Sequence, residues 1–72
     1  MRPVEIADDV IRLGQLLQLA GIVDSGSDAK FLLAGGEVVV DGEPETRRGR
    51  QLHPGAVVEA LGETVQVVRA LD

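Results

Sequence analysis

Apolar residues recur with two different spacings along this 72-residue chain. Between residues 13 and 20 they fall at i, i+3, i+4 and i+7, which predicts an amphipathic helix that ends at Gly21. A second helix is expected to begin at Ser25, whose hydroxyl can accept a backbone hydrogen bond of the first turn, and to end at Gly35-Gly36. Its predicted core residues are Ala29, Phe31, Leu32 and Leu33.

After the second helix the spacing changes to the alternation that is typical of strands. Val38 and Val40 precede Asp41-Gly42, a strong signal for a tight hairpin turn. Further strands are expected at residues 3–6, 57–60 and 64–68, with a turn at Gly62 and a frayed tail at residues 69–72. The predicted fold class is α+β, in which a two-helix unit packs on a small, mostly antiparallel sheet, and residues 1–72 are expected to form a single domain.

Composition narrows the possible functions. Cysteine is absent and no cluster of metal ligands occurs, so the 44% of hydrophobic residues must form the core without disulfides or metal. We expect a cytoplasmic protein that uses no cofactor and spans no membrane, because no apolar run approaches about 20 residues. The single histidine, His53, adjoins a turn, and no phosphate-binding glycine loop is present. Catalytic activity is therefore not expected.

The net charge of −5 argues against binding to nucleic acid, but the basic residues are unevenly distributed. Arg47, Arg48 and Arg50 fall within four positions, and the arginine fork matches phosphate oxygens. One interpretation is a phosphate-binding loop. The other is a solvated turn in which these arginines pair with Glu37, Glu43 and Glu45.

Four more polar residues belong to the predicted helix pair: Arg12, Gln15, Ser27 and Lys30. If the N-terminal ends of both helices point to one side, their dipoles would add to a phosphate site there. Gly14 weakens the first helix by up to about 1 kcal/mol relative to alanine. That cost indicates either tolerance in a first turn or the close approach of another part of the backbone.

The run from Arg12 to Glu59 carries a pattern that resembles the S-four-type RNA-binding domain, named after a small-subunit ribosomal protein. The resemblance covers residues 4–68, with a motif core at 12–60, and it is strongest to the small stand-alone bacterial members of the YaaA/YbcJ type. Those members carry the Glu-Thr-Arg-Arg-Gly-Arg signature found here at residues 45–50. The other matching positions are Arg12-Leu13, Gly21, Ser25, Ala29, Gly36 to Gly42 and Pro54-Gly55. Gly26 stands where many members have arginine.

The resemblance implies a non-catalytic, ribosome-associated protein that recognises structured RNA, ribosomal or transfer RNA, by phosphate and shape contacts. The residues it implies for RNA binding are Arg12, Gln15, Ser27, Lys30, Arg47, Arg48 and Arg50. A monomer is favoured. The alternative is a protein–protein interaction module that docks on a ribosomal or enzyme partner through the acidic residues Asp8, Asp9, Glu59 and Glu63.

Overall fold

Five strands form the main sheet of the computed structural model, which describes residues 1–71, and they lie in the order β1-β7-β6-β3-β4. β1 pairs with β7 in parallel and the other three pairs are antiparallel, so the predicted sheet type is confirmed. A second, two-stranded sheet joins β2 to β5. The strands are β1 Arg2–Ile6, β2 Ile11–Arg12, β3 Val39–Val40, β4 Glu43–Pro44, β5 Gln51–Leu52, β6 Val57–Ala60 and β7 Glu63–Arg69.

Two tight hairpins set the register of the sheet. Asp41 and Gly42 join β3 to β4 with φ values of 50° and 85°, the left-handed pair that a type I′ turn requires. Leu61 and Gly62 join β6 to β7 in the same way, with φ values of 50° and 78°. Both predicted turns are confirmed, but the second places leucine where Asn, Asp or Gly is preferred.

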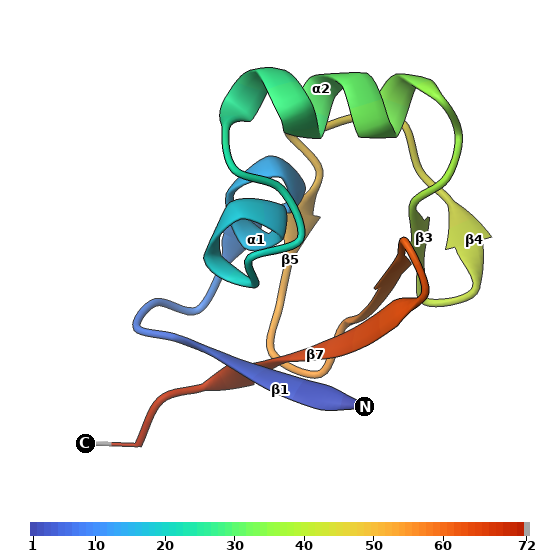
Figure 1. Ribbon diagram of the computed structural model, residues 1–72. Coiled ribbons are helices and arrows are strands. Elements are labelled where there is room, and N and C mark those ends of the chain that lie inside the picture. The colour runs from blue at the N-terminus through green and yellow to red at the C-terminus, as the bar shows by residue number, and fades with distance from the viewer. Residues whose placement is uncertain (72) are drawn as a thin grey trace.

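The two helices form a layer over one face of the sheet (Figure 1). Helix α1 covers Leu13–Leu19 and helix α2 covers Gly26–Ala34. The hydroxyl of Ser25 accepts a 3.1 Å hydrogen bond from the backbone N–H of Asp28, as the sequence predicts. Gly36, with φ 73°, lets the chain leave α2.

The core fills the space between the helix layer and the sheet. The alternation of β3, β6 and β7 and the helical spacing of α1 both place aliphatic side chains there. Each fully buried valine or leucine contributes about 1.5–3 kcal/mol relative to an exposed one. The fully buried larger residues are Leu13, Leu16, Leu17, Leu33, Leu52, Val38, Val40, Val58, Val65 and Val67.

Two predictions about individual segments were wrong. Phe31 is 85% exposed, because it lies about 200° around α2 from both Ala29 and Leu33, which face the core. The tail does not fray from residue 69, since Arg69 belongs to β7 and the N–H of Ala70 donates a 2.9 Å hydrogen bond to the carbonyl of Ile6. Asp72, the last residue of the predicted tail, lies outside the described residues.

The opposite positions of Leu33 and Phe31 on α2 give a direct test of the packing. We expect Leu33→Ala to lower the free energy of unfolding by about 2–5 kcal/mol, because it opens a cavity in the core. Phe31→Ala should change it by less than about 0.5 kcal/mol, since the ring packs against little. Urea denaturation followed by circular dichroism measures both, and equal losses would contradict this orientation of α2.

Candidate nucleic-acid interface

The segment from Glu45 to Arg50, here called the arginine loop, docks against the start of α1. The N–H of Leu13 donates a 2.8 Å hydrogen bond to the carbonyl of Arg50, and the N–H of Gly14 donates a 2.9 Å hydrogen bond to the carbonyl of Arg48. The first N–H groups of a helix have no partner within the helix. Backbone carbonyls of the loop therefore supply the cap that the sequence before α1 lacks.

This docking explains the glycine at the second position of α1. A Cβ atom on Gly14 would lie 3.3 Å from the Cβ of Arg48, which is tighter than ordinary van der Waals contact, and 3.4 Å from the carbonyl oxygen of Arg48. Of the two interpretations of Gly14, the close approach of another backbone is the one the structure supports. Because the loop carbonyls occupy the N–H groups of Leu13 and Gly14, these two donors of the first turn of α1 are not available to a phosphate.

A buried carboxylate holds the arginine loop together. Glu45 is 7% exposed, and its Oε2 accepts hydrogen bonds from the backbone N–H groups of Thr46 and Arg47 at 3.0 and 3.2 Å. The guanidinium of Arg47 binds both oxygens, through Nε at 3.3 Å and Nη2 at 3.0 Å. Arg50 Nη1 adds a contact of 3.2 Å to Oε1. These hydrogen bonds, those from the Arg47 side chain foremost, lower the pKa of Glu45 to about 2.

The seven basic side chains divide into two groups. Four form ion pairs, namely Arg2 with Glu63, Arg69 with Asp9, and Arg47 and Arg50 with Glu45. The other three, here called the unpaired cations, form no ion pair within residues 1–71: Arg12, Lys30 and Arg48. All three belong to the residues that the sequence predicts for RNA binding.

A depression of about 360 Å³ lies where α1, the first turn of α2 and the arginine loop meet. Its lining includes Arg12, Gln15, Gln18, Gly26, Arg48 and Gly49. Two of the unpaired cations thus line the same depression, and the third, Lys30, directly follows Ala29, another lining residue. Side-chain amides and guanidinium groups supply hydrogen-bond donors here, the chemistry that phosphate and sugar oxygens require.

The predicted binding residues therefore fall into three sets. Arg12, Gln15 and Arg48 are brought together at the depression, whereas Ser27 and Lys30 lie exposed on the adjoining part of α2. Arg47 and Arg50 turn toward Glu45, and Arg50 lines a different depression beside His53.

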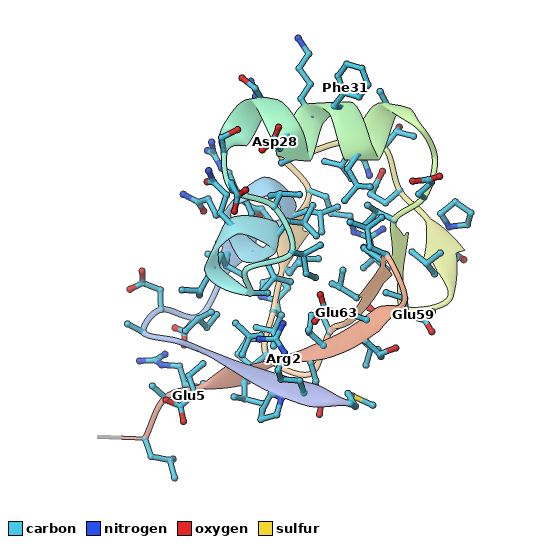
Figure 2. The ribbon with its side chains drawn as sticks, in the orientation of Figure 1. Arg2, Glu5, Asp28, Phe31, Glu59 and Glu63 are labelled. Carbon is cyan, nitrogen blue, oxygen red and sulfur yellow. The ribbon has the colours of Figure 1, made fainter. Side chains whose placement is uncertain are left out.

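Sequence reasoning missed Gln18, although its spacing of i+3 from Gln15 places it on the same side of α1. The predicted ion pairing of the arginines is confirmed for Glu45. Glu37 and Glu43 form no ion pair in the part of the chain that the structure describes. Of the acidic residues named for protein docking, Asp9 and Glu63 are already paired with Arg69 and Arg2; Arg2 and Glu63 are labelled in Figure 2.

Residues 4–68 match the family model described as the S4 domain. The chain belongs to the S4 domain family. This confirms the resemblance seen in the sequence, and the region matched takes in the arginine loop, both helices and all seven strands in whole or in part.

Three relatives place this S4 domain among known proteins. The probable ribosome maturation protein RlbA of Bacillus subtilis is 48% identical over 60 residues, covering 83% of this chain and 84% of RlbA. The putative RNA-binding protein YbcJ of Escherichia coli is 43% identical over 58 residues, covering 81% of this chain and 83% of YbcJ. A tyrosine–tRNA ligase of Thiobacillus denitrificans is 45% identical over 53 residues, but these cover only 13% of that enzyme.

The fold itself has a solved counterpart. The solution structure of YbcJ from Escherichia coli, reported to reveal an αL motif involved in RNA binding, superposes on this S4 domain with a TM-score of 0.72 and 38% identity. The superposition covers 94% of this chain and 87% of YbcJ.

Within residues 1–71, no helix is long and apolar enough to cross a membrane, and no group of three or more histidine, cysteine, aspartate or glutamate side chains could hold a metal ion.

The depressed pKa of Glu45 predicts a specific dependence of stability on pH. Because the pKa falls from 4.5 to about 2 on folding, the ionised carboxylate stabilises the fold above pH 4.5, and this contribution is lost as the pH falls toward 2. We expect Glu45→Gln to lower the free energy of unfolding most at neutral pH, and the difference from wild type to shrink below pH 4.5.

Urea denaturation at a series of pH values measures this difference. Glu43→Gln is the matched control, because Glu43 is exposed and lacks an ion pair among residues 1–71. A Glu45→Gln difference that stays constant from neutral to acid pH would show that the carboxylate does not anchor the loop.

Proposed function

We propose that this S4 domain is a non-catalytic protein that binds structured RNA at the depression between α1, α2 and the arginine loop. The observation that carries the proposal is the position of the unpaired cations. In a chain of net charge −5, Arg12 and Arg48 line one depression and Lys30 adjoins it. Phosphate is the ligand that such a group of cations and amide donors fits.

The contacts suggest different roles for the arginines of the loop. Arg48 has no carboxylate partner within residues 1–71, so its guanidinium fork is available to a phosphate. Arg47 shares its fork with Glu45 but is 75% exposed, so the remaining Nη1 can contact an adjacent phosphate. Arg50 is more enclosed and acts chiefly to position the loop.

The composition of the depression favours recognition of shape over recognition of bases. No aromatic residue is among its lining residues, and the chain's one aromatic, Phe31, lines a different depression. Base stacking of the kind used by single-strand binders is therefore not available there. A folded RNA, whose phosphates are held at fixed spacing, suits a rigid group of cations.

The name of RlbA favours ribosomal RNA over transfer RNA, since the tyrosine–tRNA ligase is matched over only 13% of its length. RlbA is named a probable ribosome maturation protein, and it matches most of both chains. We therefore propose a ribosome-associated role in the cytoplasm for this S4 domain, acting as a monomer. Neutralisation of about three to five phosphates predicts that log K falls against log salt with a slope of about −2 to −4.

The experiment compares two arginine variants with the same change in net charge. Arg48→Ala removes an unpaired cation of the depression, whereas Arg69→Ala removes one at the end of β7, where it pairs with Asp9. Binding to folded ribosomal RNA fragments is measured by filter binding over a salt series. We expect Arg48→Ala to weaken binding and reduce the slope by about 1, and Arg69→Ala to match wild type.

A gain of function in the same assay strengthens the test. The Cβ position of Gly26 has no atom within 4 Å, so Gly26→Arg can add a third cation, beside Arg12 and Arg48, to the lining of the depression without a clash. It should bind more tightly and steepen the slope by about 1. Equal affinity and slope in wild type, Arg48→Ala and Gly26→Arg would overturn the proposal, as would salt-insensitive binding.

A further inference from the structure

A larger depression, of about 560 Å³, extends from α2 to the β6–β7 turn. We call it the acidic groove. It shares no lining residue with the depression between α1, α2 and the arginine loop. Asp28, Phe31 and Gly35 lie at i, i+3 and i+7 of α2 and form one wall, whereas Gly26 and Ala29 face the other depression. The two depressions therefore lie on different flanks of the same helix.

The walls of the acidic groove hold apolar side chains that the fold does not bury. Phe31 is the only aromatic residue of the chain and is 85% exposed. In Figure 2 its ring stands out from α2, away from the sheet. Leu61, at the β6–β7 turn, is 60% exposed, and the half-buried Ile22 and Leu32 continue the apolar surface between them.

Leucine is also an unfavourable residue type for the β6–β7 turn at position 61. Its φ of 50° is a conformation that leucine seldom adopts and that Asn, Asp and Gly adopt readily. The β3–β4 turn of this chain has the preferred Asp41-Gly42 pair at the equivalent positions. Local folding preference therefore gives no reason for leucine at residue 61, and neither does burial in the core. A contact outside the chain would account for it.

The charges around the groove indicate which chemical class of partner it fits. Its carboxylates are Asp24, Asp28 and Glu37, and no lysine, arginine or histidine is among the lining residues. None of the three carboxylates forms an ion pair within residues 1–71. An apolar surface flanked by carboxylates of one sign is complementary to a chain segment that carries basic residues beside apolar ones.

We propose that the acidic groove binds a basic, apolar segment of a partner protein while the opposite flank of α2 binds RNA. Leucine-like side chains of the segment contact Phe31 and Leu61, and its lysines or arginines pair with Asp28 and Glu37. A second copy of this chain fits less well, because a symmetric pairing of two grooves would bring six carboxylates together. The inference goes beyond RNA binding and does not depend on it.

The experiment uses a defined peptide as the probe. A fluorescent peptide of alternating leucine and lysine is titrated with the full chain, and anisotropy gives the affinity at low and high salt. A peptide with serine in place of leucine has the same charge and measures attraction by net charge alone. The proposal expects the leucine peptide to bind at least about tenfold more tightly than the serine peptide.

Two double variants locate the binding. Phe31→Ser with Leu61→Asn removes the apolar walls, and asparagine suits the φ at residue 61. Leu19→Ser with Leu71→Ser removes two exposed leucines that lie outside the groove. The first pair should weaken binding of the leucine peptide about tenfold or more, and the second pair should leave it unchanged.

Two single variants, one in the groove and one at the proposed RNA site, are measured in the same peptide assay. Glu37→Lys should weaken peptide binding and its salt dependence, whereas Arg48→Ala should leave both unchanged. Equal affinity for the leucine and serine peptides, or equal loss in the two double variants, would overturn the proposal. So would concentration-dependent dimerisation in sedimentation equilibrium that Phe31→Ser with Leu61→Asn abolishes, because a second copy would then occupy the groove.

Discussion

Two backbone hydrogen bonds, from Leu13 to Arg50 and from Gly14 to Arg48, connect the start of α1 to the arginine loop. Through them the carbonyls of the loop satisfy the first two N–H groups of a helix whose N-cap residue, Arg12, makes no side-chain cap hydrogen bond, and the helix in turn holds the backbone of Arg48 in place. The absence of a side chain at Gly14 allows this approach. Folding and the presentation of the candidate binding surface thus depend on the same contact, and a shift of the loop would disturb both.

Glu45 offsets the repulsion between the clustered arginines by forming ion pairs with Arg47 and Arg50. Three arginines in four positions repel one another; the buried carboxylate binds two of them, and the third, Arg48, forms no ion pair in the part of the chain that the structure describes. Because Arg47 and Arg50 pair with Glu45, their guanidinium groups are less available to a phosphate. The same ion pairs hold the loop in one conformation. A net charge of −5 is then compatible with RNA binding, because the unpaired cations gather on one flank of α2 and acidic side chains line the other.

Periodicity and turn chemistry predicted much of this fold, because the signals are local. The Asp41-Gly42 hairpin, the Ser25 cap and the buried stripe of α1 all depend on residues a few positions apart. The parallel pairing of β1 with β7 and the docking of the arginine loop were not predicted, since they join distant segments. The hydrophobicity of Phe31 predicts a core position, but its angular position on α2 places it on the exposed side of the helix. Which arginines remain free could be decided only from the contacts of Glu45.

The flank of α2 that faces the arginine loop is the proposed contact surface for folded RNA. Nuclear magnetic resonance of the nitrogen-labelled chain, titrated with a folded ribosomal RNA hairpin, tests it most directly. We expect the backbone amide signals of Gln15, Gly26, Arg48 and Gly49 to shift and those of Ile22 and Leu61 to stay in place. Shifts concentrated at Ile22, Phe31 and Leu61, with the arginine loop unaffected, would contradict it.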